Sequence, residues 1–512
     1  MNFTLHTGEG NKAVPLMEGP HLFTDWRYIE PGRIAWLSKE GEAMPLLCDL
    51  PVEGVRGAAE KVPYGIRIVA QKAVKMGPVI DKSSPHEFIM SGPTIIYDGG
   101  KYRMWYSSTP EEEIKRNKIA DTPHVEVPGA LMNYAESDDG INWRKPSLGL
   151  FEYRGSLDNN IIKPHKGAVF KDPSAPESER YKIVEMKELT ADDVELFKRE
   201  RGGREISPIC FIKNRIRGIV AWTSPDGIRW KELPVPVMMH FSDTLTIAYF
   251  DEILRCYVGY FRMFYCGRRA IGRSETTDFW KWPLPKPILW PGADEPSPSN
   301  DYYTNSKCVY PGTKNEHFMF PAVYKRDTDI TEIRMYSSHD GIFWSKVPGN
   351  PVLETGRPGE WDGGCIFCGC GLIQLPGERI AMPYVGCTVP HKFPRTVPLG
   401  NIGYAVWEKE RLSALEAPEE GDFHTLPFIV KGRELYLNIQ TLRAGYVKVE
   451  VLDINGNPLP GRSFEDADLI VADEYKRKVT WKGESDLGNK DGQPVIFHIR
   501  MKAAKLYSFE VK

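Results

Sequence analysis

Cysteine is scarce and odd in number, since the chain of 512 residues contains nine. Small secreted scaffolds carry dense, even sets of cysteines, so this count indicates reduced thiols in a cytosolic protein. Three of the nine lie in the apolar run CIFCGCG at 365–371, which lacks the second pair of ligands that a zinc site needs. We therefore predict that this run is a buried strand, and we predict no metal ligand in the chain.

The chain also lacks charge of one dominant sign and long apolar runs. Lys and Arg number 66 and Asp and Glu number 69, so the net charge is -3. This balance excludes the basic field that is typical of nucleic-acid-binding proteins. No apolar run reaches about 18 residues, so neither a transmembrane helix nor a membrane partner is expected. The N-terminus shows no basic segment followed by an apolar one, so we expect a cytoplasmic protein, or a secreted one if a leader has been removed.

Long helical periods are scarce as well, whereas aromatic residues, glycine and proline are abundant. The chain has 13 Trp, 23 Tyr, 22 Phe, 46 Gly and 41 Pro. Short aromatic and β-branched runs separated by turn residues predict an all-β fold. One segment, TADDVELFKRERG at 190–202, starts with a capping residue and an acidic turn, so it predicts a short helix.

A repeated hairpin organises the middle of the chain. Its pattern is Ser-x-Asp-Gly-x-x-Trp, and it occurs at 137–143, 224–230 and 338–344, with a degenerate copy at 274–280. The Asp-Gly pair forms the tight turn, and the Trp packs back against the sheet as an anchor. We expect Asp139, Asp226 and Asp340 to stabilise these turns rather than to act on a ligand.

Pairs of strand-like segments precede these hairpins. Each pair consists of two apolar runs joined by a turn, and one further strand follows it, usually with the Trp anchor. The five pairs occupy 93–106, 167–184, 244–261, 306–320 and 365–384. Five meandering sheets in succession predict a five-bladed β-propeller.

The predicted propeller covers residues 85–417 and leaves a segment on each side. In residues 418–512 apolar and polar residues alternate with period two, which is typical of a β-sandwich. Residues 1–84 contain at least one strand, at 21–29, and irregular segments. We expect this N-terminal part to pack on the propeller, where it either closes the ring or covers its base.

The five blades, the repeated hairpins and the trailing β-sandwich together resemble the five-bladed propeller glycoside hydrolases, the invertase-like enzymes of the family 32 and 43 type. The resemblance runs from residue 85 to the end of the chain and concerns architecture. Lys171-Asp172-Pro173 is similar to the Arg-Asp-Pro motif of these enzymes, although it lies in a hairpin turn. Their Asn-Asp-Pro and Glu-Cys-Pro motifs are absent. The resemblance implies a glycosidase that acts on an oligosaccharide or glycoside.

The candidate site follows from propeller topology. The inner strands of all blades begin at the same rim, near the axis, and here all five starts carry acidic residues. The candidate catalytic carboxylates are Asp243, Asp301, Glu332 and Asp362. The candidate substrate-binding residues are His86, Glu87, His240, Arg262, Tyr302, Arg326 and Trp361. Aromatic faces and charged groups of this kind bind the C–H faces and hydroxyls of sugars.

Hydrolysis of a glycosidic bond needs two carboxyl groups beside the bond, one protonated and one ionised. We expect Glu332 to be the general acid, and Asp243 and Asp301 to be the base or nucleophile and the stabiliser of the transition state. The expected reaction is exo-acting, without an organic cofactor; an axial ion such as Ca²⁺ cannot be read from the sequence.

Two alternatives stay open. A glycoside phosphorylase would use phosphate in place of water, and several cations stand near the predicted rim: Arg262, Arg268, Arg269, Lys325 and Arg326. A non-catalytic carbohydrate-binding propeller would keep the aromatic residues but lack a carboxyl pair at catalytic separation.

Overall fold

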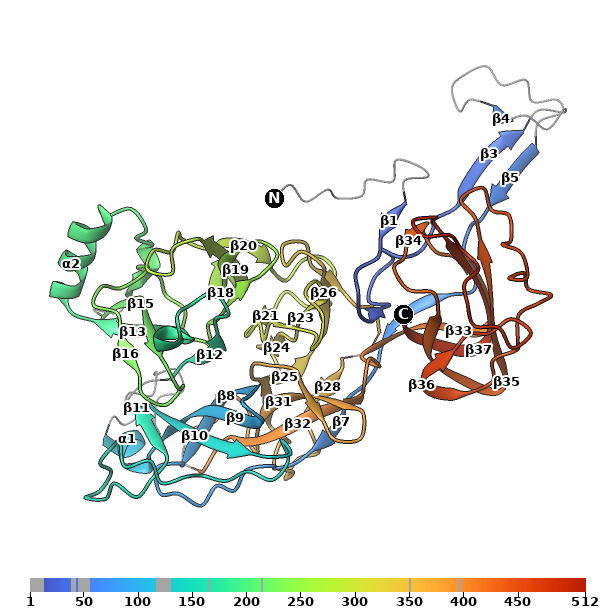
Figure 1. Cartoon of the computed structure of the whole chain (residues 1–512). Coiled ribbons are helices and arrows are strands. Elements are labelled where there is room, and N and C mark those ends of the chain that lie inside the picture. The colour runs from blue at the N-terminus through green and yellow to red at the C-terminus, as the bar shows by residue number, and fades with distance from the viewer. Residues whose placement is uncertain are drawn as a thin grey trace. The chain divides into compact units, whose positions relative to one another are not determined.

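A computed structural model of the chain describes residues 13–37, 43–44, 56–116, 130–163, 166–212, 215–349, 351–394 and 397–512. The chain forms two compact units, which Figure 1 traces by colour. We call Lys72–Lys346 with Asn350–Glu408 the propeller unit. The terminal unit consists of Met1–Gln71, Val347–Gly349 and Lys409–Lys512.

The first three blades of the propeller unit are antiparallel sheets that follow one another along the chain. Blade one contains β8 (Ile89–Asp98), β9 (Lys101–Thr109), β10 (Leu131–Ser137) and β11 (Ile161–Lys163). Blade two contains β12 (Ala168–Lys171), β13 (Tyr181–Leu189), β14 (Phe211–Ile212), β15 (Arg215–Ser224) and β16 (Lys231–Glu232). Blade three contains β17 (Ile247–Asp251), β18 (Cys256–Tyr265), β19 (Arg268–Thr276) and β20 (Lys286–Leu289).

The fourth blade is divided into two small sheets, one toward each end of its strands. One contains β21 (Asn300–Tyr302), β24 (Ala322–Lys325), β25 (Ile330–Ile333) and β28 (Leu353–Glu354). The other contains β22 (Cys308–Val309), β23 (His317–Met319), β26 (Tyr336–Ser338) and β27 (Ser345–Lys346).

The fifth blade draws its outer strand from a distant part of the chain. Its strands are β29 (Cys365–Cys368), β30 (Ile373–Leu375), β31 (Arg379–Cys387), β32 (Asn401–Glu408) and β7 (Val74–Met76). The predicted strand in the CIFCGCG run is therefore present as β29, and it is largely buried. Blade five also contacts blade one, where a bridge joins Thr94 to Cys370, so the sheets form a closed ring. This ring confirms the predicted all-β, five-bladed propeller.

The Ser-x-Asp-Gly-x-x-Trp hairpins have one geometry in all three complete copies. In the first, Asp139 Oδ1 accepts bonds from the backbone N–H groups of Ile141 and Asn142, both at 2.8 Å. The backbone bonds from Asn142 and Ile141 hold the pKa of Asp139 well below its usual value. Gly140 has a φ of 74°, a left-handed conformation that glycine adopts without strain. The aspartates of these hairpins are thus turn residues, as predicted.

Each of these turns also joins its blade to the preceding one. The Gly140 carbonyl of blade one accepts a bond from the Tyr404 hydroxyl of blade five at 2.8 Å. In the same way the Gly227 carbonyl accepts from Trp105 Nε1, and the Gly341 carbonyl accepts from the Tyr260 hydroxyl. The repeat in the sequence therefore marks the points at which neighbouring blades are held together.

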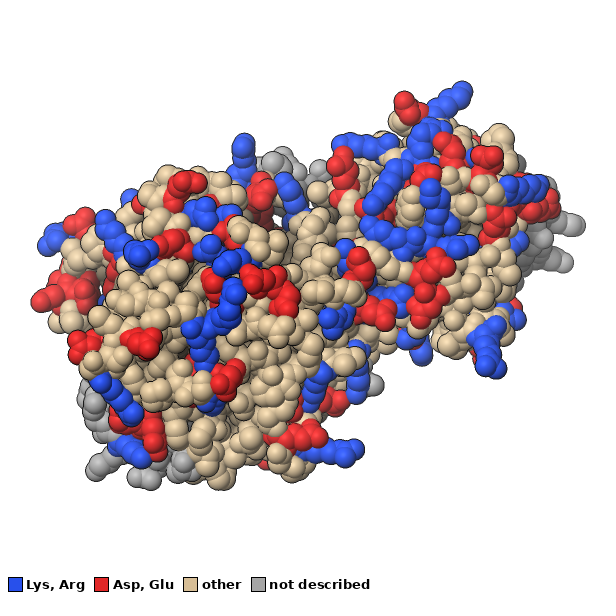
Figure 2. All heavy atoms as spheres, turned by 60° about the horizontal axis from the view of Figure 1, so that its bottom comes forward, with Lys and Arg blue, Asp and Glu red and all other residues tan. Residues whose placement is uncertain are grey.

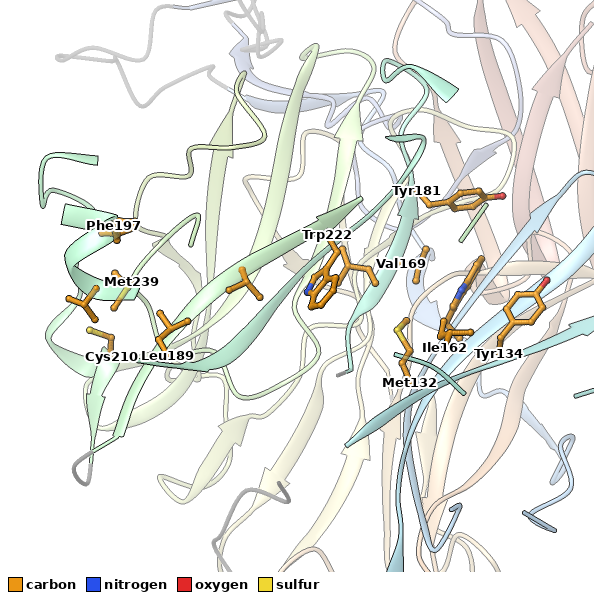
Figure 3. Close-up of a cluster of buried hydrophobic side chains, with 14 residues drawn as sticks. Met132, Tyr134, Ile162, Val169, Tyr181, Leu189, Phe197, Cys210, Trp222 and Met239 are labelled. Carbon is orange, nitrogen blue, oxygen red and sulfur yellow. The ribbon is translucent and has the colours of Figure 1, made fainter. Parts of the chain in front are cut away.

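Apolar side chains fill the spaces between blades. Figure 3 shows the cluster between blades one and two, where Trp222 and Val169 of blade two lie beside Met132 and Tyr134 of blade one. Trp105 belongs to the same cluster and is fully buried. The burial of such large side chains supplies most of the free energy that holds adjacent sheets together.

Helices are few and short among the described residues. They are α1 (Glu111–Arg116), α2 (Ala191–Arg201), and the 3₁₀ turns Glu177–Glu179 and Pro208–Cys210. The predicted helix at 190–202 is α2, capped by Thr190, whose side chain accepts from the Asp193 backbone N–H while the Asp193 carboxylate accepts from the Thr190 N–H. Gly202 ends the helix in a left-handed conformation.

The terminal unit contains a six-stranded sheet made from both ends of the chain. Its strands are β36 (Asp473–Lys478), β35 (Leu435–Leu452), β37 (Ile496–Val511), β33 (Ser413–His424), β6 (Arg67–Ala70) and β2 (His21–Leu22). Smaller sheets contain β1 (Val14–Pro15) with β34 (Phe428–Ile429), and β3 (Arg33–Leu37) with β4 (Ala43–Met44) and β5 (Arg56–Glu60). The β-sandwich expected at 418–512 stays a prediction.

The boundaries between parts differ from those expected at 84 and 418. Residues up to Gln71 belong to the terminal unit, because β2 and β6 pair with β37 and β33. Only β7 of the N-terminal part enters the propeller unit, where it pairs with β32. The strand expected at 21–29 is limited to the two residues of β2.

Charges of both signs are interspersed over the face shown in Figure 2. This mixture agrees with the nearly balanced composition of 66 basic and 69 acidic residues. Among the described helices, none has the length and apolar character required to cross a membrane.

Candidate active site

The inner strands of the propeller converge at the rim where they begin. Asp243 and Leu245 precede β17 in blade three, and Gly92 lies at a bulge of β8 in blade one. A Cβ atom on Gly92 would lie 3.4 Å from Leu245 Cδ1. Blades one and three therefore approach each other closely at this rim. Their approach narrows the space around the propeller axis.

An aromatic cluster surrounds Tyr303, the residue that follows β21 in blade four. The ring of Tyr303 lies 5.6 Å from those of Tyr324 and Phe367 and 4.7 Å from that of His391. The Tyr303 hydroxyl also lies 2.8 Å from His391 Nε2, within hydrogen-bond distance. Tyr303, Phe367 and His391 are each partly exposed, so the cluster offers aromatic surface to a ligand.

Cations gather around the same ring. The guanidinium groups of Arg262 and Arg269 lie 4.2 and 4.9 Å from the centroid of Tyr303, and Lys392 Nζ lies 5.7 Å from it. Arg262 is almost fully buried and donates to Asp243 Oδ1 at 2.5 Å and to the Tyr303 carbonyl at 2.6 Å. Asp243 keeps 25% of its side chain exposed. It is therefore a carboxylate that a ligand can reach.

Asp301 lies two residues before Tyr303, in β21, but its side chain has a different environment. Its side chain is fully buried and accepts bonds from Arg269 Nη1 and from Arg326 Nε and Nη2, each at 2.7 Å. Burial alone would raise the pKa of Asp301, but the bonds from Arg326 and Arg269 outweigh it and hold the pKa below its usual value. Asp301 thus positions Arg269 beside Tyr303, and it has no exposed oxygen for a substrate.

A second carboxyl group with the opposite character lies on β13 of blade two. Glu185 is 3% exposed, and its Oε1 accepts a bond from Lys163 Nζ at 2.6 Å. Its Oε2 is buried without a hydrogen-bond partner among the described residues. Burial raises the pKa of Glu185 above its usual value, even though Lys163 opposes the shift.

Glu185 lies beside the start of the inner strand of its blade. A Cβ atom on Gly167, the residue before β12, would lie 3.6 Å from Glu185 Oε2. The neighbouring Lys166 acts electrostatically on Glu185, and its Nζ lies 3.5 Å from the backbone carbonyl of Asp243. Lys166 therefore lies between the buried carboxyl of blade two and the backbone of Asp243 in blade three.

Glu332, the expected general acid, is instead a member of an ion-pair network. Lys325 Nζ lies 2.6 Å and Arg334 Nη2 2.7 Å from its carboxylate oxygens. Burial would raise its pKa, but the bonds from Lys325 and Arg334 lower the pKa below its usual value. A carboxyl group with a lowered pKa is a poor proton donor, so these ion pairs do not favour Glu332 as the general acid, and that role stays a prediction.

Asp362 and Trp361 lie against the strands of blade five. Asp362 is 1% exposed and bonds to Lys75 Nζ at 2.7 Å and to the Tyr384 hydroxyl at 2.8 Å. Trp361 packs on Tyr384, with their ring centroids 5.1 Å apart. These contacts join the outer strand β7 to the rest of the blade and leave Asp362 almost fully buried, so its catalytic role stays a prediction.

Glu87 and His86 also occupy buried positions that a substrate does not reach. The Glu87 side chain is fully buried, accepts from the Tyr106 hydroxyl at 2.5 Å and pairs with Lys145 at 2.7 Å. His86 Nε2 lies 3.2 Å from Asn160 Oδ1. Both were expected to bind substrate; their partners instead are parts of blade one and its connections.

Of the remaining expected binding residues, Arg326 is exposed, whereas His240, Arg262 and Tyr302 are buried. His240 is buried and bonds through Nε2 to the Arg262 carbonyl at 2.9 Å. Tyr302 is buried too, and its hydroxyl lies 2.9 Å from Glu295 and 2.5 Å from the Tyr336 hydroxyl. Successive residues of a strand point to opposite sides, so Tyr303 faces the cluster and Tyr302 does not.

Asp172 of the Lys-Asp-Pro segment follows β12 and is therefore at the end of that inner strand, away from its start. It is buried and bonds to Lys182 Nζ at 2.6 Å and to the Tyr257 hydroxyl of blade three at 2.7 Å. Asp172 therefore connects two blades, which agrees with its expected place in a turn.

Sequence reasoning missed Glu185, Tyr303 and His391. Glu185 had one signal: it interrupts the apolar run of β13, YKIVEMKEL, in which the first six residues are all buried. A carboxyl in a buried strand is rare unless it has a partner or a function. Tyr303 follows the predicted Tyr302 directly, and His391 lies in a loop whose position no pattern indicates.

No family model matches the chain. Two curated proteins match part of it, the uncharacterized protein Rv1502 of Mycobacterium tuberculosis strain H37Rv and the uncharacterized protein MT1551 of strain CDC 1551. Each is 33% identical to this chain, over 88 and 87 residues respectively. The matches cover 17% of this chain and 26% of each relative, so the chain spans about a quarter of the length of these relatives.

Several solved structures resemble the chain over most of its length. One described as a glycoside hydrolase has a TM-score of 0.42 and 13% identity and covers 67% of this chain and 94% of its own. An N-acetylgalactosamine deacetylase from F. plautii has a TM-score of 0.41 and 13% identity and covers 67% of this chain and 96% of its own. A GH32 beta-fructofuranosidase from Bombyx mori has a TM-score of 0.36 and 10% identity and covers 85% of this chain and 95% of its own. These TM-scores are too low to carry an activity over to this chain, so any proposal about its function has to rest on its own residues.

Proposed function

We propose that the protein hydrolyses a glycosidic bond of an oligosaccharide at the rim cluster around Tyr303, with Asp243 and Glu185 as the carboxyl pair. The observation that carries this proposal is the contrast between these two groups. Glu185 is buried with a raised pKa and an unpartnered oxygen, whereas Asp243 is a quarter exposed and bonded to Arg262. Glycoside hydrolysis requires one protonated and one ionised carboxyl group.

The roles follow from the two environments. Glu185, whose pKa is raised by burial, donates a proton to the leaving-group oxygen. Asp243, oriented by Arg262, acts as base or nucleophile on the sugar. Arg262 is itself positioned by His240, which bonds to the Arg262 carbonyl, and by the Tyr303 carbonyl.

The surroundings of the pair support a sugar ligand. Tyr303, Phe367 and His391 provide partly exposed rings for the C–H faces of a pyranose or furanose, and Arg262 and Lys392 lie beside them. The close approach of Leu245 to Gly92 narrows the axis at this rim. A narrow space around the axis admits the end of an oligosaccharide rather than its middle. This supports exo-acting cleavage.

A screen of the purified protein tests the proposal. Aryl glycosides and oligosaccharides are incubated with the wild type, with Asp243→Asn and with Glu185→Gln, and released sugar is quantified. We expect release by the wild type and a loss of at least about 100-fold in each variant, since general acid–base groups contribute factors of this size. Control variants are Asp158→Asn and Glu188→Gln; both side chains are exposed, and Glu188 lies on the same strand as Glu185.

A phosphorylase is the second candidate, and the excess of cations favours it. Arg262, Arg269, Arg326, Lys392 and Lys166 lie near Tyr303 or Asp243, whereas Asp243 and Asp301 are the carboxylates bonded to them. Phosphate binds well where cations converge. Sugar release that requires phosphate, with a sugar phosphate as product, would identify the protein as a phosphorylase.

Ligand binding without turnover in the wild type and in both variants would instead indicate a carbohydrate-binding propeller.

A further inference from the structure

The terminal unit contains a cluster of two histidines and an aspartate that the rim chemistry does not use. Asp422 and His424 lie two residues apart on β33, so their side chains are on the same face of the sheet. His498 on the neighbouring β37 is paired directly with His424. One potential ligand atom from each of the three residues lies within 4.8 Å of the others.

The imidazole rings of His424 and His498 lie directly against each other. Their centroids are 3.7 Å apart and their planes differ by 16°, so the rings are stacked. His498 Nε2 lies 2.7 Å from Asp422 Oδ1. Ligand atoms around a tetrahedral zinc ion are about 3.4 Å apart, so small rotations of these side chains suffice to close the site.

Other residues of the sheet hold this cluster in place. His498 Nδ1 lies 2.7 Å from Glu450 Oε1 on β35, which fixes the orientation of the ring. Arg500 Nε donates to Asp422 Oδ2 at 2.9 Å, and its guanidinium lies 4.1 Å from the Phe464 ring. A carboxylate that accepts the second N–H of a ligating histidine is a regular feature of metal sites.

His424 differs from the other two members of the cluster in one ring nitrogen. Its Nδ1 is buried and has no hydrogen-bond partner among the described residues. A buried imidazole nitrogen that no described protein group satisfies is available to a metal ion.

We propose that Asp422, His424 and His498 bind a divalent transition-metal ion of the zinc class in the terminal unit. The metal replaces the proton between His498 Nε2 and Asp422, while Glu450 keeps the bond to His498 Nδ1. Asp422 and Glu450 supply two negative charges near the ion. The positive charges of Arg500 and the nearby Lys61 partly offset them. Three protein ligands leave a fourth position for water or for a group from a ligand. This proposal differs from the prediction from sequence that the chain has no metal ligand, and it does not depend on the proposed glycosidase activity.

Metal binding by the full-length chain tests the proposal directly. Protein treated with a chelator and then dialysed is titrated with Zn²⁺ by calorimetry and with Co²⁺ by visible absorption. We expect one equivalent to bind and to raise the midpoint of thermal unfolding, because an ion that binds only the folded state stabilises it. His424→Gln should weaken binding at least tenfold, and Asp422→Asn should do the same.

Two controls make the outcome unambiguous. His339→Gln removes a histidine from a hairpin turn of the propeller unit and should leave binding unchanged. Thermal unfolding without metal reports whether each variant is folded, and His424→Gln breaks no hydrogen bond among the described residues. Absence of binding by the folded wild type at micromolar Zn²⁺, or equal binding by wild type and His424→Gln, would show that the cluster is an ion-pair network only.

Discussion

Individual carboxyl groups of this propeller differ sharply in what surrounds them. Asp301, Glu332 and Asp362 are each buried against cations. Asp243 is partly exposed, and Glu185 is buried beside one lysine, with one oxygen that has no partner among the described residues. A buried carboxylate between two arginines stabilises the fold and orients its partners, but it cannot exchange protons near neutral pH. The surroundings of a carboxyl group, rather than its distance from the axis, therefore separate candidate catalysts from supports.

Asp301→Asn should destabilise the propeller by about 1.5–3 kcal/mol, because it weakens the charge-assisted bonds that Asp301 accepts from the partly buried Arg269 and the exposed Arg326. The exposed Asp158→Asn is the control and should change the free energy of unfolding little. Urea unfolding measures both. Equal stability of the two variants would contradict this account of Asp301.

The same residue predicts a pH dependence. The pKa of Asp301 in the folded state is below its usual value of 3.8, so its contribution to stability is complete above about pH 4 and is lost as the pH falls further. The stability difference between wild type and Asp301→Asn should therefore shrink below pH 4. A difference that is constant between pH 7 and pH 3 would be inconsistent with the ion pairs.

The residue scale is also where prediction from sequence was least successful. Tyr302 was selected, but its neighbour Tyr303 faces the cluster, because one step along a strand reverses the direction of a side chain. Glu332 was selected as the acid, but the bonds from Lys325 and Arg334 lower its pKa, which does not favour that role. Such assignments depend on contacts between strands whose register the sequence does not state.

At the scale of elements, the hairpin repeat is both the clearest sequence signal and a joint between blades. The turn residues could be predicted because an Asp-Gly turn followed by a Trp anchor is determined by local geometry. The bonds from Tyr404, Trp105 and Tyr260 to the turn carbonyls could not, since they come from the preceding blade. The helix α2 could be predicted for the same local reason as the turns.

Asp139→Ala should therefore lower the free energy of unfolding by about 1.5–3 kcal/mol, since it removes charge-assisted bonds from two backbone N–H groups. Asp138→Ala changes the preceding residue, whose side chain is 66% exposed, and should have an effect below about 0.5 kcal/mol. Chemical unfolding of the two variants measures the difference. A smaller effect for Asp139→Ala than for Asp138→Ala would exclude the turn as a joint.

At the scale of the whole chain, the propeller closes through a strand that lies far from its neighbours in sequence. The outer strand of blade five is β7, and its partner β32 begins at Asn401. The N-terminal part was expected to close or cover the propeller, but the pairing itself could not be read from three residues. The salt bridge between Lys75 and Asp362 attaches this strand to the body of the blade.

Lys75→Met should destabilise the propeller by about 3 kcal/mol, because the buried Asp362 loses its counter-charge. Lys72→Met removes a lysine three residues earlier, whose pair with Glu354 is exposed, and should cost less than about 1 kcal/mol. Thermal unfolding compares the two. Equal effects would show that closure does not depend on Asp362.

The roles of Glu185 and Asp243 are tested most directly by the dependence of hydrolysis on the leaving group. Once a substrate sugar is known, kcat/KM is measured for its dinitrophenyl glycoside, which needs no acid, and for an alkyl glycoside, which does. Glu185→Gln should lose at least about 100-fold with the alkyl glycoside and little with the dinitrophenyl glycoside, whereas Asp243→Asn should lose activity with both. Equal losses of Glu185→Gln with both substrates would contradict its role as the proton donor.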